Sequence, residues 1–310
     1  MKRRNDLTVL VAALVFASLA ATVSDGEDTS PSQVVFQYDA RADLNLKVVK
    51  VETRDQASIH DVTFAASSDG ADPIKAYVVE PEGRGPFAGV LWVHWLGDPA
   101  TTNRTQYLAE ATALAPRGLV SVLVDAMWSA PRWYATRDVE RDYQNSVRQV
   151  ITLRRALDLL VSRAGVDKSR TGLVGHDYGA MYGMIMGGVD GRPKTYVFVA
   201  PGLSLSDWAF FVKQPRSKAA YLRQNATLEL TDYLQQIRGG SALFQYGSRD
   251  PFVSESAASI LFASAQPRKE KRLYPADHTV DAAEAAADRA EWLGRELGLL
   301  APSGGQPRDR

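Results

Sequence analysis

Three residues that could form a hydrolytic site lie far apart in the sequence: Asp177, Asp250 and His278. Asp177 is the centre of a Gly-His-Asp-Tyr-Gly segment, residues 175–179, which follows an apolar run. In a nucleophile elbow, flanking glycines permit a sharp strand-to-helix turn that lifts the central side chain above the sheet. A carboxylate needs no prior deprotonation to act as a nucleophile, and a helix N-terminus favours its charge. We therefore predict a nucleophile at Asp177, with an ordinary turn capped by this aspartate as the alternative.

The other two residues follow Asp177 in the chain order that this type of elbow requires, nucleophile then acid then histidine. Asp250 comes just after an apolar run at 242–246, and His278 lies between a short apolar run and the last expected helix. Both positions fall at the carboxyl ends of expected strands, where open parallel sheets place their sites. Asp250 could instead form a turn before Pro251, and His278 could cap a helix. Together with the elbow, they predict a catalytic triad.

A segment that could bind an oxyanion follows the first long apolar run. It reads Val-His-Trp-Leu-Gly, residues 93–97, at the place where this architecture supplies one backbone N–H. We expect the amide of Trp95 or Leu96 to be one donor, with the choice left open, and the amide of Tyr178 to be the other. Since one base is enough, His94 is expected to be a hydrogen-bonded structural residue.

Composition narrows the classes of function. Thirty-six basic residues balance thirty-six acidic ones, so no overall field favours nucleic acid. The chain has no cysteine, which excludes disulfides, thiolate metal sites and a cysteine nucleophile. The four histidines, His60, His94, His176 and His278, show no metal-ligand spacing. We expect no metal and no cofactor, and a small molecule as the partner.

The N-terminus resembles an export signal. Residues 2–4 are basic and residues 7–21 are mostly apolar, with small residues placed for cleavage before Ala21. We predict a signal peptide over residues 1–23, and hence a periplasmic or secreted protein. The alternative is an uncleaved N-terminal anchor, which would tie the protein to a membrane. A linker at 24–42, one domain at 43–300 and a disordered tail at 301–310 complete the expected organisation.

The elements that must position these residues follow from the hydrophobic pattern. Alternation over 44–80 indicates half-buried, antiparallel strands. Continuous apolar runs then suit parallel strands buried on both faces, at 89–93, 119–124, 171–174, 196–199 and 242–244. Helices are expected at 138–161, 180–187 and 281–297. This predicts an α/β fold, with a mostly parallel central sheet and helices on both faces.

The interval at about 203–240 is too long for a simple connection between a helix and a strand. It contains five aromatic residues, Trp208, Phe210, Phe211, Tyr221 and Tyr233. We expect a small helical lid. The alternative is a packed excursion without a catalytic role.

On these motifs the chain resembles the α/β-hydrolase superfamily, from about Ile59 to Leu299. The segments at 166–170, 247–253 and 274–278 are most similar to the dienelactone-hydrolase-like group. Typical members have cysteine as the nucleophile, and related esterases have serine. The elbow itself is similar to that of epoxide hydrolases and of haloalkane or haloacid dehalogenases, where Gly-His-Asp, an aromatic residue and glycine are common. In the usual His-Gly-x-Pro segment of those families, Trp95 and Asp98 here replace the glycine and the proline.

Three hypotheses follow from this mixture. In the first, Asp177 attacks an epoxide or a halide to form an alkyl ester, and His278, oriented by Asp250, activates the water that hydrolyses it. In the second, the protein cleaves a small ester or lactone, with Asp177 and His278 acting on water. In the third, a hydrolase fold has become an inactive binding protein.

The first hypothesis requires a donor for the leaving group. Candidates are the hydroxyls of Tyr178, Tyr221 and Tyr233 for an epoxide, and the indoles of Trp95, Trp128 and Trp208 for a halide. All of them could equally be packing residues. Aromatic residues near the expected strand ends indicate an apolar or aromatic ligand: Trp92, Trp95, Trp128, Trp133 and Tyr134.

Overall fold

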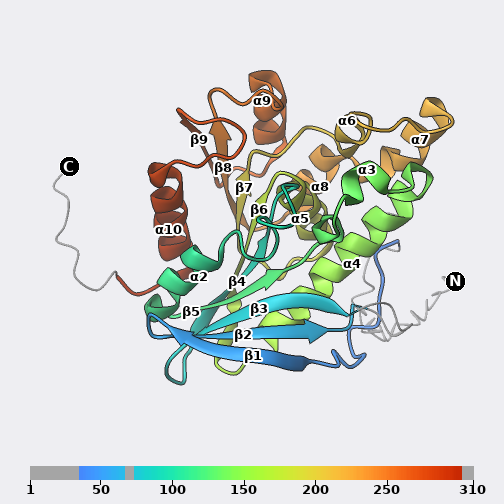
Figure 1. Cartoon of the computed structure of the whole chain (residues 1–310). Helices are drawn as coiled ribbons and strands as arrows, with labels where there is room; N and C mark the ends of the chain where they lie inside the picture. Colours follow the sequence, from blue (N-terminus) through green and yellow to red (C-terminus); the bar gives the residue numbers. More distant parts are fainter. Residues whose placement is uncertain (1–34, 67–72, 302–310) are drawn as a thin grey trace, which may run out of the picture.

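The computed structural model describes residues 35–66 and 73–301, which form one nine-stranded sheet with helices on both faces (Figure 1). The strands are β1 (Lys47–Arg54), β2 (Ala57–Phe64), β3 (Ile74–Pro81), β4 (Phe87–Val93), β5 (Leu119–Val124), β6 (Val166–His176), β7 (Thr195–Val199), β8 (Ser241–Gly247) and β9 (Lys269–Tyr274). Their order across the sheet is β1-β2-β3-β5-β4-β6-β7-β8-β9. Strands β1, β2, β3 and β5 pair antiparallel, and β5 to β9 pair parallel. The predicted fold class is confirmed.

The hydrophobic pattern of each strand matches its place in the sheet. Every residue of β5 and β8 is buried, as expected for parallel strands covered on both faces. Strand β2 instead alternates between buried and partly exposed residues. Edge strand β1 exposes most of its residues.

The helices divide between the two faces of the sheet. They are α2 (Leu108–Leu114), α3 (Trp133–Thr136), α4 (Asp142–Val161), α5 (Tyr178–Val189), α6 (Leu205–Ala209), α7 (Lys218–Asn225), α8 (Leu230–Gln236), α9 (Glu255–Ser264) and α10 (Ala283–Leu297), with short 3-10 turns η1 (Ala115–Arg117), η2 (Met127–Ser129), η3 (Val139–Arg141) and η4 (Ala226–Leu228). One core cluster joins the sheet to α4, α5, α8 and α9, and the other joins it to α2 and α10. Alternate residues of β4 point into opposite clusters. Trp92 was expected near the ligand because it lies close to a strand end. In the structure it instead packs against Tyr107 in the second cluster.

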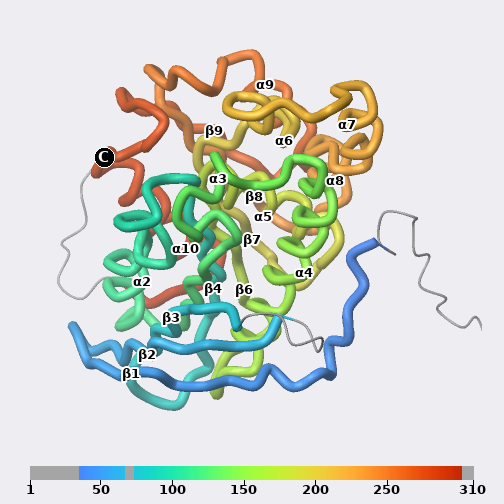
Figure 2. The backbone as a smooth tube through the Cα atoms, turned by 45° about the vertical axis from the view of Figure 1, so that its right-hand side comes forward, coloured from blue at the N-terminus to red at the C-terminus, as the bar shows by residue number. Residues whose placement is uncertain are grey.

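The interval expected to form a lid is helical. It contains α6, α7, η4 and α8, between β7 and β8. Figures 1 and 2 both place α6 and α7 beside α3. This group of helices lies close to the elbow between β6 and α5, which the next subsection describes.

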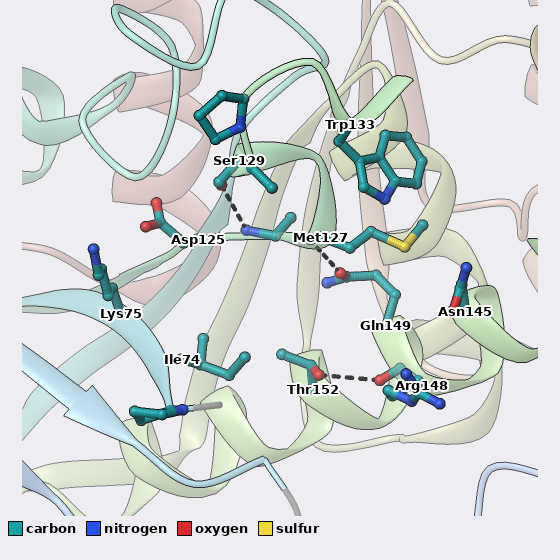
Figure 3. A pocket seen from close by; sticks show the side chains of 14 residues that line it. Ile74, Lys75, Asp125, Met127, Ser129, Trp133, Asn145, Arg148, Gln149 and Thr152 are labelled. Atoms are coloured by element: carbon teal, nitrogen blue, oxygen red, sulfur yellow. Dashed lines mark hydrogen bonds between the residues drawn. The ribbon is translucent and has the colours of Figure 1, made fainter. Parts of the chain in front are cut away.

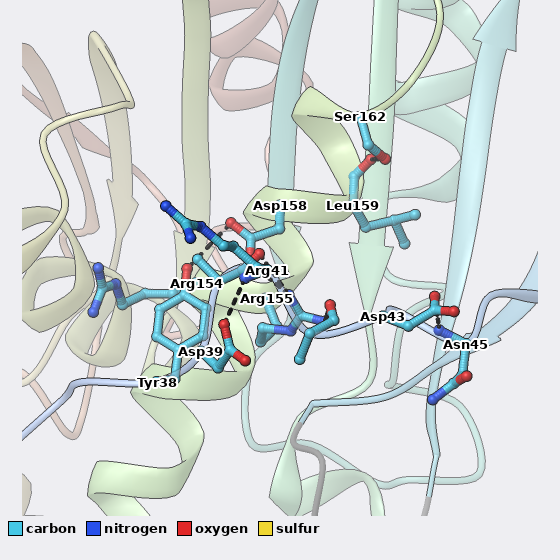
Figure 4. A network of polar contacts seen from close by, with 12 residues as sticks. Tyr38, Asp39, Arg41, Asp43, Asn45, Arg154, Arg155, Asp158, Leu159 and Ser162 are labelled. Carbon is cyan, nitrogen blue, oxygen red and sulfur yellow. Dashed lines mark hydrogen bonds and ion pairs between the residues drawn. The ribbon is translucent and has the colours of Figure 1, made fainter.

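The described part of the expected linker, residues 35–42, packs against α4 and is not a free tether (Figure 4). The Tyr38 hydroxyl donates to Asp158 at 3.1 Å, and Arg155 donates to the Ala42 carbonyl at 2.8 Å. Arg192 also pairs with Asp158. The expected signal segment at 1–23 and residues 302–310 of the expected tail lie outside the described residues. Of the helices in the described ranges, none is long and apolar enough to cross a membrane.

Candidate active site

The elbow residue Asp177 lies between the end of β6 and the start of α5. Its backbone has φ 51° and ψ −118°, a conformation that non-glycine residues adopt at a cost of about 1–3 kcal/mol. Its N–H donates to the Val199 carbonyl at 2.8 Å, which holds the turn against β7. A Cβ at Gly175 would collide with the backbone of Gly179, and one at Gly179 with that of β4. The two glycines of the motif are therefore needed for this tight crossing.

The structure brings the three predicted triad residues together. His278 Nδ1 lies 2.7 Å from Asp250 Oδ2, and His278 Nε2 lies 3.7 Å from Asp177 Oδ1. The other oxygen of Asp250 accepts the N–H groups of Phe252 and Val253 at 2.8 and 3.0 Å, which fixes the carboxylate. Asp177 is only 1% exposed and His278 4%. Asp177 Oδ1 and His278 Nε2 are buried and have no hydrogen-bond partner in the described part of the chain.

The second oxygen of Asp177 distinguishes between the two oxyanion candidates left open by the sequence. The Leu96 N–H donates to Asp177 Oδ2 at 3.0 Å. The Trp95 N–H instead donates to Gln106 Oε1 at 2.9 Å, so of the two amides it is that of Leu96 that contacts Asp177. Tyr178 is the first residue of α5, where backbone N–H groups lack partners within the helix.

Gln106 connects three parts of the site. Its Oε1 accepts from Trp95, so its Nε2 must be the donor to His176 Nδ1, 2.8 Å away. The proton of the neutral His176 ring is then on Nε2, which donates to the His278 carbonyl at 2.9 Å. This Gln106–His176 bridge links the segment at 93–97, the elbow and the loop that carries His278. Sequence reasoning missed Gln106 because a single glutamine in a polar stretch carries no recognisable spacing.

The histidines of the site differ in charge because their surroundings differ. Burial, and then the nearby His278, lower the pKa of His176 to about 3. Burial also lowers the pKa of His94 to about 4, and its ring contacts Ser129 Oγ and the Trp95 carbonyl, both at 2.8 Å, as a structural residue would. Burial would lower the pKa of His278 as well, but Asp177 and Asp250 outweigh it and raise this pKa to about 9. At 3.7 Å, Asp177 acts mainly through its charge. His278 is therefore an imidazolium at neutral pH.

Aromatic rings surround His278. The ring centres of Phe252, Trp208 and Trp95 lie 5.2, 5.3 and 6.0 Å from its own. Trp208 comes from α6, within the expected lid. Two side chains from around α3 hold the end of this helix: the Tyr134 hydroxyl donates to the Trp208 carbonyl, and Arg137 donates to the Ala209 carbonyl at 2.8 Å. These contacts cover Asp177.

Several of the proposed leaving-group donors have other partners. The Trp128 indole donates to the Trp95 carbonyl at 3.1 Å, the Tyr221 hydroxyl to Asp142 at 3.0 Å, and the Tyr233 hydroxyl to the Thr227 carbonyl at 2.8 Å. The indole nitrogen of Trp208 packs against Gly202. Of the six candidates, Trp95, Tyr178 and Trp208 remain. The Trp95 ring stacks on His176, with ring centres 5.2 Å apart.

Within residues 35–66 and 73–301, no group of three or more histidine or acidic side chains has an arrangement that could hold a metal ion. The site contains a buried carboxylate, Asp177, with one oxygen bonded to the Leu96 N–H and the other facing His278, whose ring a second carboxylate, Asp250, orients.

Comparisons with known proteins identify the fold. No protein-family model matches the sequence, and no curated protein sequence matches it. Among solved structures, the chain is similar to an acetyl xylan esterase from Paenibacillus sp. R4, at 19% identity and a TM-score of 0.67, over 86% of this chain and 92% of that one. It is also similar to acetyl xylan esterase 1 from Thermoanaerobacterium sp. JW/SL YS485, at 16% identity and a TM-score of 0.66, over the same shares of the two chains.

A third similar structure is an S-formylglutathione hydrolase from Agrobacterium tumefaciens, at 16% identity and a TM-score of 0.63, over 81% of this chain and all of that one. Likeness at this level of identity defines the fold. The chain has the α/β-hydrolase fold.

Proposed function

We propose that the protein is a hydrolase in which Asp177 attacks an electrophilic carbon of a small, apolar substrate and forms a covalent alkyl ester. The observation that carries this proposal is that the two Asp177 oxygens have different surroundings. Oδ2 accepts from the Leu96 N–H, while Oδ1 is buried, has no hydrogen-bond partner among residues 35–66 and 73–301, and faces His278. One oxygen is held and the other is free to attack.

The position of Oδ2 also indicates which oxyanion the backbone donors would stabilise. In ester cleavage by a serine enzyme, an oxyanion hole receives the carbonyl oxygen of the substrate. Here the Leu96 amide is already bonded to the carboxylate of Asp177 itself. A donor at this place would stabilise the negative charge that develops on Oδ2 when water attacks the Asp177 carboxyl carbon. Such a charge develops in the hydrolysis of an ester on Asp177.

The reaction balances in two steps. Asp177 Oδ1 bonds to the substrate carbon as the carbon–halogen or epoxide carbon–oxygen bond breaks. A halide departs with the electron pair, whereas an epoxide oxygen keeps it, stays on the substrate and takes a proton from water.

In the second step, water attacks the Asp177 carboxyl carbon and gives one proton to His278. His278 returns this proton to the departing alkoxide, so the substrate leaves as an alcohol, and the Asp177 carboxyl releases the other proton of water. Once Asp177 is esterified, it no longer carries the charge that helps to raise the pKa of His278. The imidazole can then lose its proton and serve as the base for the second step.

Incorporation of heavy oxygen tests this route. In single-turnover hydrolysis of an epoxide or a haloalkane in ¹⁸O-labelled water, we expect one label in the peptide that contains Asp177, because the attacking water supplies one carboxylate oxygen. Asp177→Asn and His278→Ala are the matched variants. Product formation without label at Asp177 would rule out the ester intermediate.

Ester or lactone hydrolysis is the second candidate, and one finding favours it: the similar structures named above include esterases. In that reaction Asp177 and His278 would act on water, since direct attack by Asp177 on an ester would give a high-energy anhydride. Loss of esterase activity in Asp177→Asn, with no label at Asp177, would support it. If wild type, Asp177→Ala and His278→Ala are equally inert on epoxides, haloalkanes and esters, the protein is not a hydrolase of these bonds and the binding-protein hypothesis gains.

We further propose that residues 1–23 direct export, on the basis of their composition. Fractionation of cells that produce the full chain, with and without these residues, tests this. Recovery of both forms in the same compartment would contradict it.

A further inference from the structure

A second hollow, separate from the triad, lies between the start of β3, the loop after β5 and helix α4 (Figure 3). Its volume is about 500 Å³, within the range of small-molecule sites. Asp177, Asp250 and His278 are not among the residues that line it. The side chains on which the argument rests are Ile74, Lys75, Met127, Trp133, Arg148 and Gln149.

The buried amide of Gln149 points into this hollow. Gln149 is 3% exposed, and its Oε1 accepts the Met127 N–H at 2.8 Å. This bond fixes the orientation of the amide, because only oxygen can accept there. Nε2 therefore faces the space between the side chains, as Figure 3 shows, and it has no hydrogen-bond partner among the described residues. A buried donor without a partner costs about 1–3 kcal/mol, which a ligand acceptor would recover.

The charges around Gln149 favour an anion. Lys75 and Arg148 both line the hollow and are exposed. Asp125 is the one carboxylate among the residues that line the hollow, and it is paired with Arg104. The Arg104 backbone N–H donates to Asp125 at 3.0 Å and Arg104 Nη1 donates to it at 3.3 Å. The cationic side chains of the hollow are therefore not matched by a free carboxylate.

The rest of the wall is largely apolar. Ile74, Met127 and Trp133 provide aliphatic, thioether and aromatic surface beside the amide of Gln149. Such a wall excludes a fully hydrated inorganic anion and suits a hydrocarbon or aromatic group.

We propose that this hollow binds a small organic carboxylate with an apolar body. The carboxylate accepts from Gln149 Nε2 and is attracted by Lys75 and Arg148, and its body lies against Trp133 and Met127. This site does not depend on the chemistry proposed for Asp177.

Phenylacetate is a suitable probe, and phenylacetamide is its uncharged control of nearly the same shape. We expect calorimetric titration of the full chain to give saturable 1:1 binding of phenylacetate, at least tenfold tighter than that of phenylacetamide. Gln149→Glu keeps the acceptor for the Met127 N–H but replaces the donor by a negative charge, so phenylacetate should bind at least tenfold more weakly. Lys75→Met, at an exposed position where folding is not at risk, should weaken phenylacetate several-fold and change phenylacetamide less than twofold.

Asp177→Asn separates this site from the triad, and phenylacetate should bind this variant as it binds the wild type. The proposal is overturned if phenylacetate binds no tighter than phenylacetamide, if neither Gln149→Glu nor Lys75→Met weakens it by more than twofold, or if Asp177→Asn abolishes it. The last result would place the ligand at the triad instead.

Discussion

At the scale of single residues, the charge state of His278 decides which reaction the site can perform. Two carboxylates share one imidazolium, and the resting histidine is a poor base at neutral pH because its pKa is about 9. A mechanism that needs His278 as a base in its first step is disfavoured, because the protonated ring cannot accept a proton. A mechanism in which Asp177 reacts first is favoured, because Asp177 then loses the charge that helps to keep His278 protonated.

The two mechanisms predict different pH profiles. Formation of the alkyl ester does not use His278 as a base, so its single-turnover rate should not follow the titration of His278 between about pH 6 and pH 9. Direct base catalysis needs neutral His278, whose population rises tenfold per pH unit below the pKa of about 9. Rapid-quench measurements of substrate consumption in a single turnover across this range check the expectation. A tenfold rise per unit would favour the direct route.

The Gln106–His176 bridge also acts at this scale. Gln106→Glu keeps the acceptor for the Trp95 N–H but cannot donate to His176 Nδ1 when ionised. We expect kcat to fall roughly tenfold to a hundredfold, since a broken buried hydrogen bond costs about 1–3 kcal/mol. The ¹⁵N shifts of His176 should report an Nε2–H tautomer in wild type and lose it in the variant. Gln144→Leu, at an exposed site, is the control; an unchanged tautomer in Gln106→Glu would refute the bridge.

At the scale of elements, strand and helix patterns predicted most of what positions the site. Continuous apolar runs located the parallel strands, and both Asp250 and His278 lie past strand ends as expected. The pattern could not separate Trp95 from Leu96, because the choice depends on Gln106, which folding brings to the loop from 11 residues away. Nor could the pattern predict that Phe252 contacts His278. Nothing in the sequence distinguishes an aromatic residue that packs in the core from one that lines the site.

The contact between α3 and α6 should control access to Asp177. Arg137 is nearly buried, pairs with Asp142 and donates to the Ala209 carbonyl. Arg137→Ala removes the ion-pair partner of Asp142 and leaves it the Tyr221 hydroxyl, so we expect a loss of about 3 kcal/mol in the free energy of unfolding. For a domain of this size the melting temperature falls by roughly 6–12 °C. Hydrogen exchange at α6 should rise in this variant but not in the exposed control Arg141→Ala. Unchanged exchange would show that Arg137 does not hold the lid.

At the scale of the whole molecule, a buried arginine, Arg155, ties the first described segment to helix α4. Arg155 is 2% exposed and holds both the Ala42 carbonyl and Asp158, while Phe36 is buried in the larger core cluster. This attachment could not be predicted from the sequence, because residues 24–42 have the polar composition of a linker. A single buried aromatic residue and carbonyl acceptors have no pattern of their own.

This attachment should contribute to global stability. Arg155→Met removes the donors to Ala42 and Asp158 in a buried setting, and we expect a loss of about 3 kcal/mol in the free energy of unfolding. Urea denaturation measures it, and hydrogen exchange should rise at 36–43. Lys168→Met at an exposed position should change stability by less than about 0.5 kcal/mol. Equal effects of the two variants would contradict the attachment.

The backbone of Asp177, with φ at 51°, also bears on how this fold can be engineered. Glycine adopts this conformation readily and would remove a buried carboxylate oxygen that lacks a partner, so Asp177→Gly should be inactive and yet melt at a higher temperature than wild type. Calorimetry checks this, and a lower melting temperature would contradict it. Selection for thermostability alone would therefore discard the proposed nucleophile, so stabilising screens on this scaffold need an activity filter at every round.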